Sequence, residues 1–274
     1  MTSHVFYQVD AFAGRPFEGN PACVMLLPEG FADDATLQAI AAENNVSETA
    51  YLVPEGEGAW QLRWFTPATE VPLCGHATLA AAHVLFAHEG FAGAVVRFRT
   101  RQSGELFVRR RGAAYEMDFP AADVFDTQAD ADIAAALGAQ PVHAWGGPFF
   151  AAQFETAEDV AALAPDFRAL RALGVSGQGG TWARGNFGCF ALGGDGVDVT
   201  SRFFAPGSGI DEDPATGSWH CMLGVIARDL TGQAAHDCFQ AYPGRGARIG
   251  VHLEGDRVKL TGNAVTVIEG RFAF

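Results

Sequence analysis

Two copies of one local pattern constrain the fold of this chain more than any other feature of its sequence. In each copy an arginine and two aromatic residues lead to a proline, and a glycine-containing turn then precedes a helix-forming run of small apolar residues. The copies occupy 63–67 with 73–86, and 202–206 with 211–227. Phe65 and Phe204 are 139 residues apart in a chain of 274. The spacing indicates an internal duplication, so we expect two similar halves.

The turn at 211–218 predicts how each long helix begins. Pro214 fixes its own φ and pushes Asp213 into an extended conformation, while Thr216 or Ser218 is suited to cap the apolar run that follows. A helix start presents free backbone N–H groups and the positive end of the helix dipole, which favour a carboxylate or phosphate. Two such starts facing each other would enclose a polar cleft where the halves meet.

Composition limits the class of protein. Apolar residues make up 49% of the chain and include 22 Phe, enough for a sizeable core. A net charge of −14 with no Lys/Arg-rich run argues against nucleic acid or an anionic membrane as partner. The five cysteines are odd in number and widely spaced, and they lack the spacing of a zinc site. With no signal peptide and no membrane-spanning run, these features predict a reduced, cytoplasmic protein.

The remaining patterns predict many short strands and a few helices. A helix is expected at 34–44, with Leu37, Ile40 and Ala41 on one face, and a longer one from Thr78 to about His88. The glycine-rich stretch 174–180 is interpreted as a flexible loop. We expect an α+β chain without β-α-β alternation, in which two sheets each wrap around one helix. The acidic, proline-containing segment 120–128 predicts domains at 1–120 and 121–274, and a return of the last strand to the first domain is left open.

Three ionisable residues beside these turns are candidates for chemistry. Glu48 is a lone carboxylate at the mouth of a strand, where burial would suit it to proton transfer near neutrality; the alternative is a strand-end acid or a capping partner. His76 follows Gly75 at the first helix start and could equally satisfy local backbone groups. Asp213 could orient a substrate or complement the helix dipole. Cys74 has no cysteine counterpart in the second turn, which disfavours a two-thiol mechanism.

Seven motifs in order along the chain resemble the PhzF-like family of phenazine biosynthesis isomerases. They are Val9–Phe12, Gly19–Pro21, Ser47–Ala50, Arg63–Pro67, Cys74–Thr78, Arg202–Pro206 and Glu212–Ser218. The resemblance implies a diaminopimelate epimerase-like fold of two domains, each a strongly bent, mostly antiparallel sheet around a central helix, and a homodimer. One departure is the segment 240–246, where the family commonly has a Gln-Gly followed by Gly-Arg-Pro.

The same resemblance implies roles for individual residues. Glu48 would be the proton shuttle, with His76 and Asp213 as its partners. The polar cradle for the substrate would consist of Ser218 with the backbone of Gly75 and Gly217, and Asn20 would be a further substrate contact.

These features together predict an isomerase that moves a proton within a small carboxylate-bearing metabolite, without metal, nucleotide or other cofactor. Two alternatives remain open at this point. One is an amino-acid epimerase or racemase of the same fold, and the other is a non-catalytic small-molecule binding protein.

Overall fold

The computed structural model describes residues 2–56, 58–173, 176–177, 180–181 and 184–274. The chain has a mixed α/β fold and divides into two compact units. Unit 1 comprises Met1–Asp118 together with Thr261–Phe274, and unit 2 comprises Phe119–Leu260.

The described part of unit 1 contains two helices. Most of its strands come from the first part of the chain. The helices are α1 (Asp34–Asn44) and α2 (Gly75–Ala87). The strands are β1 (Ser3–Ala11), β2 (Asn20–Leu26), β3 (Glu48–Gly56), β4 (Ala59–Phe65), β5 (Glu70–Val71), β6 (Val95–Thr100), β7 (Glu105–Arg111), β8 (Ala114–Pro120) and β19 (Ala264–Ala273). The predicted helix at 34–44 is confirmed, and its first turn is capped by Asp33, whose side chain accepts from the Thr36 N–H.

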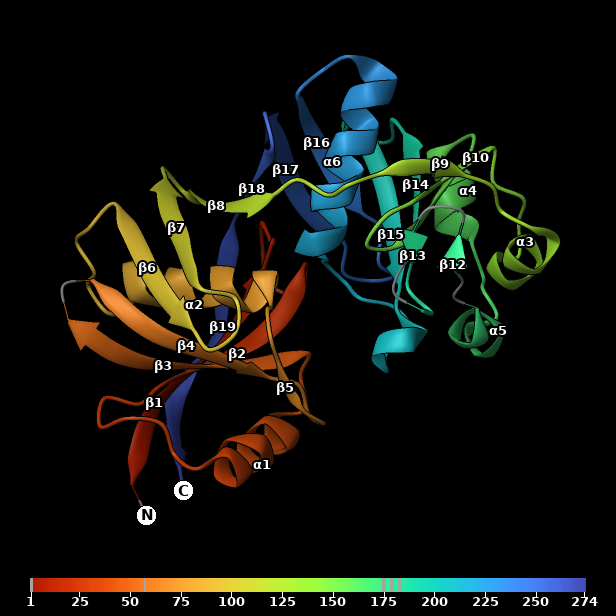
Figure 1. Ribbon diagram of the computed structural model, residues 1–274. Coiled ribbons are helices and arrows are strands. Elements are labelled where there is room, and N and C mark those ends of the chain that lie inside the picture. The colour runs from red at the N-terminus through yellow and green to blue at the C-terminus, as the bar shows by residue number, and fades with distance from the viewer. Residues whose placement is uncertain (1, 57, 174–175, 178–179, 182–183) are drawn as a thin grey trace. The chain divides into compact units, whose positions relative to one another are not determined.

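Strand β1 lies between two partners that are far apart in the sequence. It pairs antiparallel with β2, where Tyr7 faces Val24, and antiparallel with β19, where Tyr7 faces Glu269. Figure 1 shows the blue strand β19 among the red and orange strands of the N-terminal part. The last strand of the chain therefore belongs to the first unit.

Helix α2 is buried on every side, as expected for a helix whose sequence is apolar all round. Residues 76–86 are all buried, and the helix contacts β1, β2, β3, β7 and β19. Small side chains at 80–82 let the strands approach the helix axis closely. The observed start at Gly75 is three residues earlier than the predicted start at Thr78, which places His76 inside the helix.

Unit 2 has its own helices, strands and core. The helices are α3 (Ala131–Leu137), α4 (Ala157–Ala162), α5 (Phe167–Ala172), the 3₁₀ turn η1 (Pro206–Ser208) and α6 (Gly217–Thr231). The strands are β9 (Phe125–Thr127), β10 (His143–Gly146), β11 (Phe150–Gln153), β12 (Ser176–Gly177), β13 (Gly180–Thr181), β14 (Phe187–Leu192), β15 (Val199–Phe204), β16 (Ala235–Gln240), β17 (Ala247–Glu254) and β18 (Arg257–Gly262).

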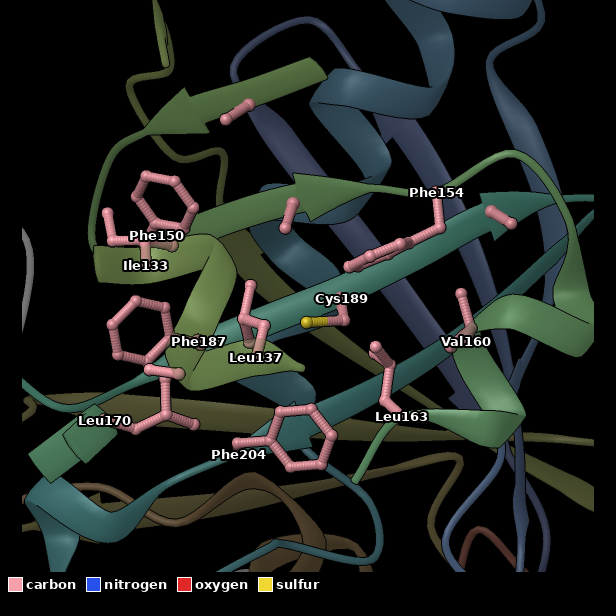
Figure 2. Close-up of a cluster of buried hydrophobic side chains, with 14 residues drawn as sticks. Ile133, Leu137, Phe150, Phe154, Val160, Leu163, Leu170, Phe187, Cys189 and Phe204 are labelled. Atoms are coloured by element: carbon pink, nitrogen blue, oxygen red, sulfur yellow. The ribbon is translucent and has the colours of Figure 1, made fainter. Parts of the chain in front are cut away.

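One cluster of buried side chains in unit 2 joins the short helices to the sheet. Figure 2 shows Leu137 of α3 and Leu170 of α5 beside Phe187 and Phe204 of β14 and β15. Phe150 of β11 lies 5.6 Å from Phe187, measured between ring centroids. Phenylalanine therefore supplies much of this core, in keeping with the composition.

The expectation of no β-α-β alternation was wrong. Among the pairings described, four are parallel, and a helix lies within each connection: β2–β3 through α1, β4–β6 through α2, β11–β14 through α4 and α5, and β15–β16 through α6. The other pairings described are antiparallel, so the sheet is mixed. Parallel partners need a long crossover, and here the helices provide it. The first two crossovers, through α1 and α2, lie in unit 1, and the other two, through α4 with α5 and through α6, lie in unit 2. Within these crossovers, the order of strands and helices in unit 1 recurs in unit 2.

Two further predictions concern the glycine-rich stretch 174–180 and membrane-spanning segments. Residues 174, 175, 178 and 179 of the predicted glycine-rich loop lie outside the described residues, and the described residues beside them form β12 and β13, which pair antiparallel. Within the described part of the chain, no helix is long and apolar enough to cross a membrane.

Candidate functional site

Parallel pairing of β2 with β3 brings Asn20 and Glu48 to one edge of unit 1. Both residues begin their strands, and the register sets Ala22 opposite Glu48. Because parallel strands begin at the same edge of a sheet, the two polar side chains are neighbours despite a separation of 28 residues in sequence. Asn20 is fully buried, and the Glu48 side chain is 17% exposed.

The start of α2 adds His76 and Cys74 to this edge. His76 Nε2 lies 2.9 Å from Glu48 Oε2, an ion-pair distance, although Oε2 is buried and makes no hydrogen bond of good geometry. His76 Nδ1 lies 3.3 Å from Asn20 Nδ2 and 3.5 Å from Cys74 Sγ. The predicted partnership of Glu48 with His76 therefore has a matching contact in unit 1. We call Glu48, Cys74 and His76 the unit 1 triad.

The environment of His76 favours its charged form. Burial by itself would lower the pKa of the imidazole, but the neighbouring Cys74 sulfur and Glu48 carboxylate raise that pKa well above its ordinary value. Burial also raises the pKa of the Cys74 thiol to about 11, so this thiol is neutral at pH 7 and the carboxylate is the anion that counts there. The pair then resembles an imidazolium held against a carboxylate.

The Asn20 amide as placed suits a neutral His76 ring, and a flip of the amide would suit the charged ring. In the neutral ring, Asn20 Nδ2 donates to His76 Nδ1 while Ser47 Oγ donates to Asn20 Oδ1 over 2.8 Å. In the imidazolium both ring nitrogens carry protons, so the matching arrangement has the Asn20 amide flipped, with its oxygen toward Nδ1. Ser47 can accept as well as donate and so serves both arrangements. Sequence reasoning did not single out Ser47, although its place beside Glu48 was a signal.

The start of α6 in unit 2 is held by a different set of contacts. Thr216 is at the N-cap position, as predicted, but the prediction that a side chain caps this helix was wrong. Thr216 Oγ1 donates to Asp213 Oδ2 over 2.5 Å instead, and Gln240 Nε2 donates to Thr216 Oγ1 over 3.2 Å. The Thr216 side chain is therefore used within the turn and makes no capping hydrogen bond to the first turn of the helix.

Gln240 is the residue of this turn that sequence reasoning missed. It is fully buried at the end of β16; its Oε1 accepts from the Thr216 N–H over 2.9 Å, and its Nε2 donates to the Asp213 carbonyl. One amide thus ties strand β16 to both ends of the segment 213–216. A glutamine at the end of a strand has no sequence pattern that predicts burial or a structural role. The one sequence feature that could have drawn attention to Gln240 is its place at the start of the unusual segment 240–246.

The predicted site residues fall into two groups, one in each unit. Asn20, Glu48, Gly75 and His76 lie together in unit 1. Asp213, Gly217 and Ser218 lie at the start of α6 in unit 2, where Gly217 is buried and Ser218 is exposed. The substrate contacts predicted for them stay predictions.

An arginine–glutamate fork braces the turn before the long helix in each unit. Arg63 donates through Nε and Nη2 to the two oxygens of Glu70 over 2.7 and 2.8 Å. Arg202 binds Glu212 through the same two nitrogens over 2.8 Å each. Each guanidinium also stacks on a phenylalanine two residues further along its strand, with the centroids of Phe65 and Phe204 5.0 and 4.8 Å away. Both halves of the duplication therefore contain this arginine–glutamate fork as well as the long helix that follows it.

The repeat also shows which residues of unit 2 correspond to the unit 1 triad. Phe65 faces Thr49 across β3 and β4, and Phe204 faces Phe187 across β14 and β15. The helix starts are aligned by their first residues, Gly75 and Gly217. The equivalent positions are Glu48 with Asn186, Cys74 with Thr216, and His76 with Ser218. None of the three residues in unit 2 can act as an acid or base near neutral pH.

Comparison with known proteins gives one consistent result. The family described as phenazine biosynthesis-like protein (PhzC-PhzF) matches residues 9–270. Two proteins of Pseudomonas aeruginosa, each named an uncharacterized isomerase, are 44% and 40% identical to the chain, over 97% and 96% of both sequences. The crystal structure of a PhzF-family phenazine biosynthesis protein from Enterococcus faecalis is 37% identical, covers 100% of both chains and superposes with a TM-score of 0.92. The similarity therefore extends over both units.

Proposed function

Because the chain belongs to the phenazine biosynthesis-like, or PhzF, family and the two full-length relatives described above are named isomerases, it is an isomerase, and we propose that Glu48 shuttles the proton. The substrate that we propose is a small carboxylate-bearing metabolite, and the reaction is a proton shift between two of its atoms without a cofactor. The observation that carries this proposal is the 2.9 Å contact of Glu48 Oε2 with His76 Nε2. It sets a buried carboxylate oxygen within 2.9 Å of an imidazole nitrogen.

The pair supplies both halves of a proton shuttle. In the proposed reaction the Glu48 carboxylate acts first as the base, with the His76 ring beside it. When Glu48 takes a proton from the substrate, its attraction to His76 is lost, and this disfavours the protonated acid. The proton is then returned readily to a second substrate atom on the same face. The flexible glutamate side chain allows one oxygen to reach both atoms, and partial burial limits exchange with water.

The asymmetry between the units favours isomerisation over the alternative of epimerisation. Inversion at a carbon takes a proton from one face and delivers another to the opposite face, and two acid–base groups serve this best. The unit 2 equivalents of the triad are Asn186, Thr216 and Ser218, which do not titrate in this range. We propose that Asp213, Gly217 and Ser218 bind polar groups of the substrate and leave the proton shift to Glu48.

Two finer features of the family are part of this proposal. We propose that each unit forms a strongly bent sheet around its long helix, in the manner of diaminopimelate epimerase, and the burial of α2 on every side supports this for unit 1. We also propose a homodimer, which sedimentation of the purified protein would reveal as twice the 29.0 kDa chain mass.

The first experiment identifies the reaction type. The protein is incubated with cyclic and acyclic amino and hydroxy acids in D₂O, and carbon-bound deuterium is followed by NMR and mass spectrometry. Deuterium that appears without inversion supports isomerisation, whereas inversion supports an epimerase. A compound that binds without any exchange of carbon-bound hydrogen supports a binding protein.

The second experiment tests the role of Glu48. Glu48→Gln should lower turnover by on the order of 10²–10⁴, because the amide cannot accept the proton. Ligand affinity and thermal stability should change little, since the amide has nearly the same volume. The matched control is Glu43→Gln, which alters an exposed carboxylate near the end of α1 and should keep full activity. Near-native turnover of Glu48→Gln would show that the base lies elsewhere, with His76 or Asp213 next in order.

A further inference from the structure

The unit 1 triad combines three different metal-ligand types in a small volume. A carboxylate oxygen of Glu48, the Cys74 sulfur and a ring nitrogen of His76 all lie within 4.8 Å of one another. Cys74 Sγ is 4.0 Å from His76 Nε2, and that nitrogen is 2.9 Å from Glu48 Oε2. A tetrahedral zinc ion, with bonds of about 2.0–2.3 Å, separates its ligand atoms by roughly 3.2–3.6 Å. The contacts of His76 depart from this range by a few tenths of an ångström. The Glu48 oxygen and the Cys74 sulfur lie within 4.8 Å of each other and would have to approach by up to about 1.2 Å, which rotation of the glutamate side chain can provide.

The three ligands are held by rigid elements. Cys74 is the N-cap residue of α2, His76 is the second residue of that helix and Glu48 is the first residue of β3. Cys74 and His76 are buried, and the Cys74 carbonyl accepts from Thr78 Oγ1 over 2.6 Å. Glu48 Oε2 is buried without a hydrogen bond of good geometry, so it offers a lone pair to a cation.

Asn20 is placed to support the histidine ligand once its amide is flipped. A metal-bound imidazole donates its other N–H to an acceptor, which fixes the ring. With His76 bound through Nε2, its Nδ1 faces Asn20 Nδ2 over 3.3 Å, so a flip of the amide would present the oxygen as that acceptor. Within the described part of the chain, this is also the one group of three such side chains whose ligand atoms come so close together.

We propose that the unit 1 triad binds one Zn²⁺ ion and that bound zinc inhibits the enzyme. A thiolate, an imidazole and a carboxylate form a donor set that suits zinc, whereas Mg²⁺ and Ca²⁺ prefer oxygen ligands. On binding, the Cys74 thiol releases its proton to solvent, as does His76 if it is charged. The metal then occupies the lone pair of Glu48 that would accept the substrate proton. Binding follows from the geometry alone, whereas inhibition rests on the proposed role of Glu48.

Cobalt(II) provides a direct test of the site in the full-length, reduced protein after removal of metals. Titration with Co²⁺ should produce a near-ultraviolet thiolate-to-cobalt absorption that saturates at one ion per chain, and Zn²⁺ should abolish it stoichiometrically. Cys74→Ala should remove this absorption. The control Cys221→Ala removes another buried cysteine, in α6, and should retain it. Glu48→Gln should weaken Zn²⁺ binding, measured by equilibrium dialysis, by on the order of tenfold or more.

The outcomes separate the metal site from the proposed reaction. An absorption that persists in Cys74→Ala, or none in the parent protein, overturns the metal site. If Cys74→Ala fails to fold, the Glu48→Gln variant provides the test. An unchanged Zn²⁺ affinity in that variant would also overturn the metal site. Once a substrate is known, Zn²⁺ that binds the triad without lowering turnover contradicts the inhibition. If the parent protein binds no metal but Glu48→Gln loses turnover, the metal site is overturned and the proposed reaction is supported.

Discussion

His220 is a buried histidine in α6 that cannot become charged at low cost. It is fully buried, and its Nδ1 donates to the Thr216 carbonyl over 2.8 Å. Burial lowers its pKa to about 4, from an ordinary value near 6.5. Between these two values the unfolded chain binds the proton and the folded chain does not, so stability falls as the pH falls. His83 in unit 1, whose pKa burial and nearby His88 also lower to about 4, acts in the same direction.

Replacing His220 should therefore flatten the pH dependence of stability. Between pH 7 and pH 5 the parent protein should lose about 2 kcal/mol more than His220→Asn, whose amide can still donate to Thr216. Urea unfolding at the two pH values measures the difference. His143→Asn, at a half-exposed position, is the control and should behave as the parent. The raised pKa of His76 works in the opposite sense, because its contribution is present below pH 6.5 and is lost as the pH rises through the folded-state value. Equal slopes for His220→Asn and the parent would contradict this assignment.

Gly19 fixes the backbone directly before Asn20. Its φ is +62°, and a Cβ there would lie 2.0 Å from the Ala11 carbonyl oxygen. Gly19→Ala should cost on the order of 3 kcal/mol in the free energy of unfolding, since both the left-handed backbone and the clash with main chain must be relieved. It should also weaken ligand binding, because relief of the clash moves Asn20. Gly270→Ala, where a Cβ meets nothing within 4 Å, is the matched control. Similar stabilities for the two variants would refute this role.

At the scale of elements, the arginine–glutamate forks fix the turns that carry the site. Arg202 and Glu212 are 6% and 8% exposed, and Arg202 Nη1 also donates to the Leu163 carbonyl over 2.7 Å. Asp213 follows Glu212 directly, and its N–H donates to the Phe203 carbonyl over 3.0 Å. The fork therefore positions Asp213 without being part of the predicted substrate contacts.

Arg202→Met should lower the free energy of unfolding by about 3–5 kcal/mol, because it leaves the Glu212 carboxylate buried and unpaired. Arg228→Met removes a half-exposed ion pair with Asp229 and should cost less than about 1 kcal/mol. Urea denaturation of both variants makes the comparison. Glu212→Gln in the Arg202→Met background should restore part of the loss, since the orphaned charge is gone. A cost for Arg202→Met no larger than that of Arg228→Met would mean that the turn is held by other contacts.

Local patterns predicted elements well and their partners poorly. The helix at 34–44 followed from apolar spacing. Glu48 and His76 were singled out for their places beside a strand and a helix start and lie in contact, while their roles stay predictions. The parallel crossovers were missed because alternation of side chains along a strand does not encode which strand lies next to it. The capping error at Thr216 has the same origin. Gln240 arrives from a strand 24 residues away and engages the hydroxyl that local rules assign to the helix.

At the scale of the whole molecule, unit 1 depends on a strand encoded after unit 2. Strand β19 pairs along β1, and Phe272 and Phe274 pack against the cluster formed by α1, β2 and β3. Unit 2 has a separate cluster built from α3, α4, α5 and their sheet. Loss of β19 should therefore act on one unit more than on the other.

Truncation after Asn263 tests this dependence by hydrogen exchange. Amides of β1 and β2 should lose protection, while those of β14 and β15 keep it, because only the former lose a strand partner or a packed neighbour. Glu269→Pro, which removes one donor of the ladder opposite Tyr7, should produce a milder form of the same pattern. A uniform loss of protection across both units would show that they unfold as one.

The pairing of β1 with β19 also has a consequence for synthesis on the ribosome. Strand β1 is translated before unit 2, and its second partner is translated only after every residue of unit 2. At about 5–20 residues per second, the outer edge of β1 stays without that partner for roughly 10–50 s. An unpaired strand edge is a template for aggregation. During this interval the nascent chain therefore exposes an edge that chaperones on the ribosome could shield.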